Sequence, residues 1–156
     1  MTSKKDFTDE EWIRIRRAPF VAGLAISIAD RGGPIELAKE TMASLRSATL
    51  PPSQEELLSS VALDVQALAQ QRQNPLGDFR PTGGQQVLDE LRAVNEIVTA
   101  KASPQEVEAF RGWLVATAQA AADAAKEGGF MGFGAEQVSA GEKQMLDQLR
   151  AALGVA

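Results

Sequence analysis

Apolar side chains recur along most of the chain at the three- and four-residue spacing of an α-helix that faces a core. The clearest stripe follows Pro51-Pro52, with Leu57, Val61, Val65 and Leu68. Residues at this spacing lie on one face of a helix. No segment shows the sustained two-residue alternation that is typical of a half-buried strand. The pattern therefore predicts an all-α fold.

Turn residues and capping sequences divide the pattern into six or seven helices. Pro19 is expected to break or kink the chain, because its ring opposes the preceding turn. Gln73 to Gly84 reads as a loop, in which Asp78, Phe79 and Arg80 are a candidate recognition tip. The first three expected helices run from Thr8 to Arg17, from Pro19 to Ala29, and from Pro34 to the stop at Pro51. The fourth begins at Ser53, and the fifth includes Val87 and Val98. The last two run from Pro104 to Lys126 and from Ser139 to Gly154.

The expected helix after Pro34 also carries an apolar face. Its members are Ile35, Ala38, Met42 and Leu45, which share the i, i+3, i+7, i+10 spacing of a single helix face. Periodicity therefore predicts that these four side chains lie on one face of this helix.

Four sequences of the form Ser/Thr-x-x-Glu precede these apolar segments and predict helix starts. In such a capping box the hydroxyl accepts a hydrogen bond from the third helical amide, and the glutamate accepts one from the amide of the cap residue. The four boxes pair Thr8 with Glu11, Ser53 with Glu56, Ser103 with Glu106, and Ser139 with Glu142.

Length and charge bound the class of protein. The 156 residues suit one domain, taken as 1–156, and 44% of them are hydrophobic, enough for a core. The net charge of −5 disfavours nucleic-acid binding, because affinity for the phosphate backbone comes mainly from Lys and Arg. A local basic patch at Arg14, Arg16 and Arg17 remains.

The chain contains no Cys, His or Tyr. It therefore lacks a thiolate nucleophile, the usual general base at neutral pH and the typical zinc ligands. We expect a non-catalytic protein, with an enzyme that uses carboxylates alone as the alternative.

The apolar run Ala18–Ala29 follows Arg16-Arg17 and imitates the layout of a signal peptide. Acidic residues lie upstream of it and no A-x-A cleavage sequence follows it. A bilayer-spanning helix needs about 20 apolar residues, which this run does not reach. We expect a buried core helix, no transmembrane segment and a cytoplasmic location.

The two halves of the chain show a similar order of features. Each has a capping box, a tryptophan (Trp12 or Trp113), a slim apolar helix and a Gly-Gly elbow that leads toward another helix. The sequence therefore suggests two duplicated helical hairpins, although hairpins that merely share turn residues would look the same.

The segments "AADAAKEGGF" and "VSAGEKQMLDQLRAALGV" resemble the final hairpin of the tellurite-resistance TerB family, and "LAISIADRGGPIELAKETMASL" is similar to its first hairpin. The resemblance implies an all-helical bacterial cytoplasmic protein without enzymatic activity. It also implies divalent-cation binding at the acidic elbows, at Asp30 and Glu36 in the first and Glu127 and Glu142 in the second.

The acidic elbows depart from the family pattern. The second elbow carries the insertion "MGFGAEQ" and lacks the family's run of acids. A calcium ion takes about six to eight oxygen ligands, more than either elbow offers. We therefore expect no cofactor, with a divalent cation at these four residues as the alternative.

The glycine-rich elbow from Lys126 to Lys143 is the main candidate site. Its G-x-x-G-x-G order reverses the dinucleotide fingerprint and follows a helix instead of a strand, so no phosphate site is expected. Its large apolar side chains either seal the core or form an exposed patch for a partner or membrane surface. The partner-binding residues under the second interpretation are Gly129, Phe130, Met131 and Phe133.

Trp12 is the remaining candidate for partner binding. Both tryptophans fit core packing, but Trp12 has Ile13 and Ile15 beside it and could instead anchor a partner. The predicted function is a bacterial, TerB-like interaction or stress-response module with a protein partner, and a homo-oligomer is compatible with it. The alternative is a small-molecule or divalent-metal sensor with a pocket between helices, beside the alanine-rich helix from Pro104.

Overall fold

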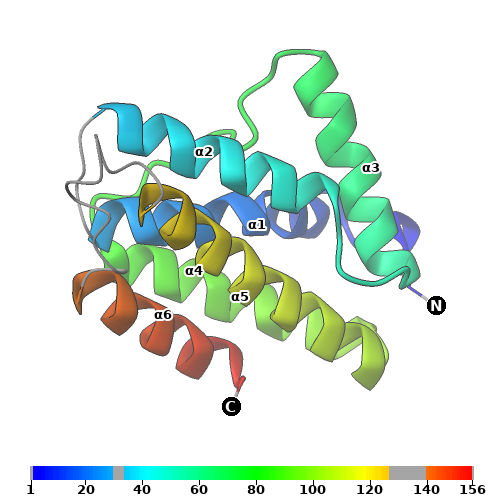
Figure 1. The fold of residues 1–156 in the computed structure, drawn as a ribbon. Helices are drawn as coiled ribbons and strands as arrows, with labels where there is room; N and C mark the ends of the chain where they lie inside the picture. The colour runs from blue at the N-terminus through cyan, green and yellow to red at the C-terminus, as the bar shows by residue number, and fades with distance from the viewer. Residues whose placement is uncertain (1, 30–33, 127–139, 156) are drawn as a thin grey trace.

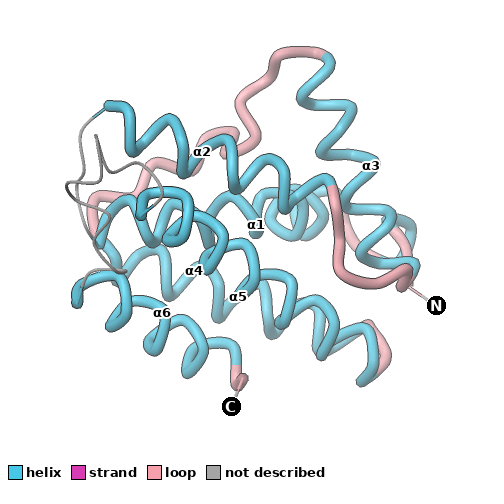
Figure 2. The backbone as a smooth tube through the Cα atoms, in the orientation of Figure 1, coloured by secondary structure: helices cyan, strands magenta, loops and turns pink. Residues whose placement is uncertain are grey.

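The computed structural model describes residues 2–29, 34–126 and 140–155, and every regular element in them is helical. The predicted all-α bundle is confirmed (Figures 1 and 2). Helix α1 lies at the centre and contacts all five other α-helices. The elements are the 3-10 turn η1 (Lys4–Asp6), α1 (Asp9–Ala29), α2 (Pro34–Thr49), α3 (Glu56–Gln70), α4 (Gly84–Lys101), α5 (Pro104–Lys126) and α6 (Ala140–Leu153).

Helix α1 continues through Pro19, so the predicted break there is wrong. Proline removes the amide that would bond to the Ile15 carbonyl, at a cost of about 3 kcal/mol or more inside a helix. Apolar side chains on both sides of Pro19 are buried, among them Ile15, Phe20 and Val21. Burying each large apolar side chain contributes about 1.5–3 kcal/mol. Several such side chains offset the cost of the proline and keep the helix continuous.

The apolar run Ala18–Ala29 forms the second half of α1, and most of its side chains are buried or half-buried in the bundle. The expectation of a core helix is confirmed. Within the described ranges, no helix combines the length and the apolar character that crossing a membrane requires.

Two of the four predicted capping boxes are present. The Glu11 amide donates to Thr8 Oγ1 at 3.1 Å, and the Thr8 amide donates to Glu11 Oε1 at 2.9 Å. Ser103 and Glu106 exchange the same two bonds at 3.2 and 3.3 Å. These boxes start α1 and α5 where the sequence predicts.

The predicted box at Ser53 is wrong. Helix α3 begins only at Glu56, with Glu55 as its cap residue, and Ser53 Oγ is buried without a hydrogen-bond partner among the described residues. Because the helix starts later than expected, the Ser53 hydroxyl does not reach the free amides of its first turn. The fourth box depends on Ser139, which lies outside the described residues.

Trp113 ties α5 to the end of α2. Its indole N–H donates to the Ser47 carbonyl at 2.8 Å, and the hydroxyls of Ser47 and Thr117 share a hydrogen bond at 2.7 Å. The alanines of α5 make this approach close, because buried Ala118 and Ala122 add little bulk. The predicted core position of Trp113 is confirmed.

Helices α1 and α2 cross closely at Gly23 and Ser44. A Cβ atom added to Gly23 would lie 2.9 Å from the Ser44 Cβ and closer still to Ser44 Oγ. Real Cβ atoms essentially never approach this closely. The crossing therefore requires glycine at position 23.

Helix α3 is anchored at its base and projects from the bundle at its other end (Figure 1). At the base, Leu57 and Leu58 are fully buried. Asp64 accepts the Trp12 indole N–H at 2.7 Å and pairs with Lys4 at 3.4 Å. The last turn of α3 is mostly exposed. The base of α3 is thus fixed to α1 and η1, while its tip stands apart.

Glu106 fixes the N-terminal residues to the start of α5. The Thr2 amide and hydroxyl donate to its carboxylate at 2.9 and 2.7 Å, over and above the capping bonds from Ser103. Burial raises the pKa of Glu106, but these hydrogen bonds outweigh burial and leave the pKa below its ordinary value. The carboxylate is therefore held in its charged form.

Candidate functional site

The predicted partner-binding loop, with Gly129, Phe130, Met131 and Phe133, lies outside the described residues. The described chain leaves it at Lys126, the end of α5, and resumes at Ala140, the start of α6. The role of this loop stays a prediction.

Trp12 is not a surface anchor, and that part of the predicted site is corrected. Its side chain is 2% exposed, packs 6.0 Å from the Phe7 ring between centroids, and donates to Asp64 on α3. The indole is buried and its N–H has a hydrogen-bond partner, which is the core packing that the sequence also allowed for Trp12. Ile13, beside it, is the exposed residue at 43%.

The predicted metal ligands do not form a described site. Asp30 and Glu127 lie outside the described residues, and so does the side chain of Glu36. Glu142 is described, and it is 6% exposed in the first turn of α6. No group of three or more metal-ligating side chains gathers within the described part of the chain. Cation binding at the elbows stays a prediction.

Among the described side chains of α2, from Thr41 onward, two small residues are buried and one large apolar residue is exposed. Ser44 and Ala48 are buried, whereas Met42 is 58% exposed and Leu50, just after the helix, is 68% exposed. Met42 and Leu45, which the sequence places on one face, thus differ in burial, because Leu45 is half-buried. The reason is tertiary: α1 and α5 pack against α2, and Ser44 lies at the crossing with α1.

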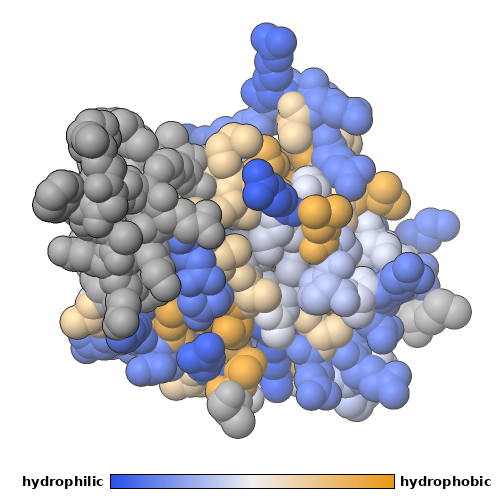
Figure 3. Space-filling view, viewed as in Figure 1, coloured by the Kyte–Doolittle hydropathy of each residue, from blue (hydrophilic) through white to orange (hydrophobic). Residues whose placement is uncertain are grey.

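A groove of about 500 Å³ opens between the C-terminal halves of α2 and α3, called here the α2–α3 groove. The side-chain amide of Gln66 donates to the Thr49 carbonyl at 3.5 Å and joins the two helices across it. Figure 3 shows apolar surface gathered on this face between the two helices. The lining residues are Met42, Leu45, Arg46, Thr49, Leu50, Gln66, Ala69 and Gln70.

A second groove, of about 390 Å³, lies on the other side of α2 against α5. Arg46 and Leu50 line both grooves, so the outer surface of α2 is continuous across them. The groove is shallow on its α5 side, because the small residues Ala120 and Ala124 form most of that side, with Asp123 beside them. Apolar side chains therefore line both grooves along the outer surface of α2.

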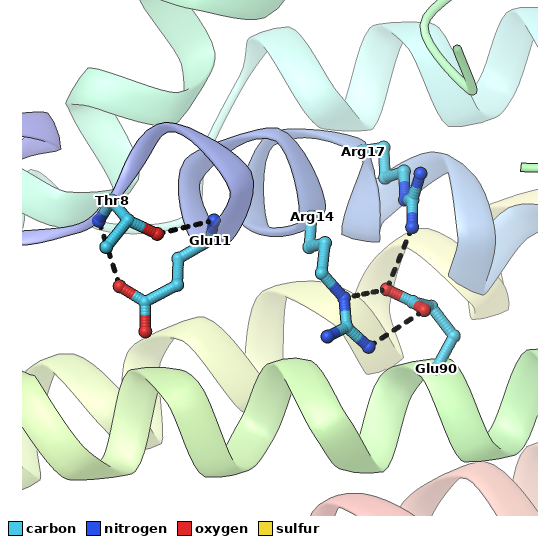
Figure 4. Close-up of polar contacts among 5 residues, drawn as sticks. All are labelled: Thr8, Glu11, Arg14, Arg17 and Glu90. Carbon is cyan, nitrogen blue, oxygen red and sulfur yellow. Dashed lines mark hydrogen bonds and ion pairs between the residues drawn. The ribbon is translucent and has the colours of Figure 1, made fainter. Parts of the chain in front are cut away.

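A charged cluster joins α1 to α4 (Figure 4). Arg14 binds Glu90 through both carboxylate oxygens, with Nε 2.8 Å from Oε1 and Nη2 3.0 Å from Oε2. Arg17 Nη2 donates to Glu90 Oε1 at 3.2 Å. The Glu90 side chain is only 10% exposed. One half-buried carboxylate thus binds two guanidinium groups.

The cluster shifts the ionisation of its members. Burial raises the pKa of Glu90, but the hydrogen bonds and charges of Arg14 and Arg17 outweigh it and leave the pKa lowered. The hydrogen bond to Glu90 raises the pKa of Arg14. Opposite charges in close contact favour both charged forms.

A pocket of about 450 Å³, called here the arginine pocket, lies beside this cluster. The loop before α4 forms its second wall. The Phe79 ring centroid is 5.0 Å from the Arg17 guanidinium carbon, and Arg80 Nη1 donates to the carbonyls of Gly77 and Phe79 at 2.7 and 3.0 Å. The lining residues are Arg14, Arg17, Asp78, Phe79, Arg80, Pro81, Gln86, Asp89 and Glu90.

The structure brings together two features that the sequence suggests separately. The predicted recognition tip Asp78–Arg80 lies against two members of the predicted basic patch, Arg14 and Arg17. The third member, Arg16, points elsewhere and lies 4.0 Å from Asp64. Sequence reasoning missed Glu90, because its partners are 73 and 76 positions away.

The outer surface of α2 was also missed, although one signal was available. Leu50 is a large apolar residue directly before Pro51-Pro52, where the helix must end. Comparison with known proteins offers no independent guide to either surface: the chain matches no protein-family model, no curated protein and no solved structure.

Proposed function

We propose that the protein is a non-catalytic interaction module whose α2–α3 groove binds an amphipathic helix of a partner protein. A bacterial cytoplasmic module of this class is also what the resemblance to TerB implies. The observation that carries the proposal is the outward placement of Met42 and Leu50, with small residues on the core side of the same helix.

The shape of the groove favours a helical partner. Two helices diverge from a bonded point at Thr49 and Gln66, and leave a trough lined mainly by Met42, Leu45 and Leu50. A helix that lies in such a trough presents apolar residues at i, i+3 or i+4, and i+7. Met42 and Leu50 are separated by about 12 Å along a helix axis, so a partner of two to three turns contacts both.

The charge of the groove favours an acidic partner. Arg46 is the one charged residue among the described residues that line the α2–α3 groove, and it also borders the α2–α5 groove. A guanidinium group binds a carboxylate with a matched pair of donors. We therefore expect the partner helix to carry Asp or Glu beside its apolar stripe.

A selection of helical peptides against the purified chain tests this proposal. A displayed library of amphipathic helices is expected to yield binders with an apolar i, i+4, i+7 stripe and an acidic residue. Leu50→Glu should reduce their affinity by at least about tenfold, since a charge would enter an apolar contact. Leu63→Glu is the matched control, because Leu63 is 65% exposed on α3 and does not line the groove.

Three results would contradict the proposal. The selection could yield no helical motif, or the selected peptides could bind the Leu50→Glu and Leu63→Glu variants equally well. The third is a wild-type dimer in sedimentation experiments that Leu50→Glu dissociates, because a second copy of the chain would then occupy the groove. Circular dichroism confirms that each variant is folded.

A further inference from the structure

The arginine pocket offers hydrogen-bond donors from three arginines. Glu90 accepts two bonds from Arg14 and one from Arg17. A guanidinium group carries five N–H donors, so most donors of these two arginines are not used by Glu90. Arg17 Nε is buried and has no hydrogen-bond partner among the described residues. A buried donor of this kind is costly unless an acceptor reaches it.

Arg80 adds a third guanidinium group in a fixed position. Its Nη1 atom is held by the backbone carbonyls of Gly77 and Phe79, which orients the planar group at the pocket wall. Its Nη2 and Nε atoms make no hydrogen bond within the described residues. The loop places Arg80 there through Gly77, whose φ of 57° suits glycine.

Two of the three acidic side chains that line the pocket are already paired with arginines. Asp89 already accepts bonds from Gln85 at 2.9 Å and from Arg92 at 3.1 Å, both on its own helix. Glu90 is fully engaged by its two arginines. The exposed Asp78 is then the one remaining carboxylate among the lining residues, set against three guanidinium groups.

We infer that the arginine pocket binds a small carboxylate with an apolar body. The carboxylate supplies an acceptor for the unpaired donors of Arg17 and for the remaining donors of Arg14 and Arg80, since its two oxygens match the paired N–H donors of a guanidinium group. Phe79 and Pro81 line the same pocket and provide the apolar wall. Inorganic phosphate is not the expected ligand, because it has no apolar body to contact Phe79 and Pro81.

Titration with benzoate tests this inference on the full chain at constant ionic strength. Isothermal calorimetry is expected to show saturable benzoate binding in the range of about 1–10 mM, and none for benzamide, which has the same ring without the charge. Arg80→Gln should weaken benzoate binding by about tenfold or more, because it removes one of the three guanidinium groups. Arg72→Gln is the control, since Arg72 lies in the same loop and does not line the pocket.

Each remaining outcome overturns the inference. These are an absence of benzoate saturation, equal binding of benzamide, tighter binding of inorganic phosphate, or equal benzoate affinity in the Arg80→Gln and Arg72→Gln variants. Arg80→Lys is the second variant, which keeps the positive charge and removes the planar pair of N–H donors. It should bind benzoate more weakly than the wild-type chain, and unchanged affinity would contradict the role of Arg80.

Discussion

The arginine pocket and the α2–α3 groove are of similar size and opposite construction. Both lie between helices, with volumes of about 450 and 500 Å³. The first is bounded by Glu90, which three hydrogen bonds link to α1. The second is crossed by a single bond from Gln66 at 3.5 Å.

The difference suggests that the contacts beside the arginine pocket stabilise the fold, whereas the α2–α3 groove is free to bind a partner. The contact of α1 with α4 depends in part on charged groups that are costly to leave unpaired. Met42 and Leu50 of the α2–α3 groove remain largely in water, so they contribute little to folding and keep their capacity for a partner. Substitutions in the two regions should therefore differ in their effect on stability.

The largest effect is expected from Glu90→Ala. The substitution leaves Arg14 and Arg17 without their shared acceptor, and should lower the free energy of unfolding by about 1–3 kcal/mol, since it removes charge-assisted hydrogen bonds from a half-buried cluster. Urea denaturation measures the loss. Asp89→Ala is the control on the same helix, where the exposed pair with Arg92 should contribute less than about 1 kcal/mol. Equal losses in the two variants would show that burial of the Glu90 cluster has no energetic consequence.

Acid titration sharpens the same comparison. Glu90 has a lowered pKa in the folded state, so its stabilisation is present above the unfolded-state pKa of about 4.3 and is lost as the pH falls through the folded-state pKa. The stability difference between the wild-type chain and Glu90→Ala should therefore narrow below about pH 4. A difference that stays constant down to pH 2 would contradict this assignment.

An intermediate effect is expected from Gly23→Ala. The added methyl group meets Ser44 at the crossing of α1 and α2, and such overpacking typically costs about 1–3 kcal/mol. Because α2 carries the α2–α3 groove, this variant should also weaken helix binding while leaving benzoate binding intact. Thermal unfolding and the two binding assays measure these effects.

The double variant Gly23→Ala with Ser44→Gly tests the cause. Removing the Ser44 side chain removes both atoms that the new Cβ meets, so the double variant should regain stability relative to Gly23→Ala. Purely additive losses in the double-mutant cycle would show that the two residues are not in contact.

The smallest effect on stability is expected from Leu50→Ser. Leu50 is 68% exposed, and surface substitutions of this kind usually change stability by less than about 0.5 kcal/mol. Leu57→Ala is the contrasting variant, because the fully buried Leu57 should cost about 2–5 kcal/mol. If Leu50→Ser destabilised the chain as much as Leu57→Ala, the α2–α3 groove would be part of the core.

Local signals predicted the elements better than they predicted the faces of those elements. The boxes at Thr8 and Ser103 place helix starts correctly, because capping depends on atoms three residues apart. Pro19 shows the limit, since its local cost is outweighed by burial along the whole of α1. Met42 shows it again, because periodicity identifies an apolar position without specifying what covers it.

The candidate sites were predictable only in fragments. The basic residues Arg14 and Arg17 and the loop Asp78–Arg80 were each recognisable in the sequence. Their common pocket was not, because nothing local pairs α1 with α4 across more than 70 positions. The environment of Trp12 was not predictable for the same reason, since its hydrogen-bond partner Asp64 lies on a separate helix.

The sequence by itself determined that the chain folds as an all-α bundle, because helix periodicity, capping boxes and turn residues act over a few positions. Only the tertiary structure decided which apolar residues stay exposed and which charged residues meet. Those outcomes depend on how the helices cross, and the crossing at Gly23 and Ser44 is set by a close approach that no local pattern encodes. At that crossing Ser44 is buried, while Met42 and Leu50 stay at the surface.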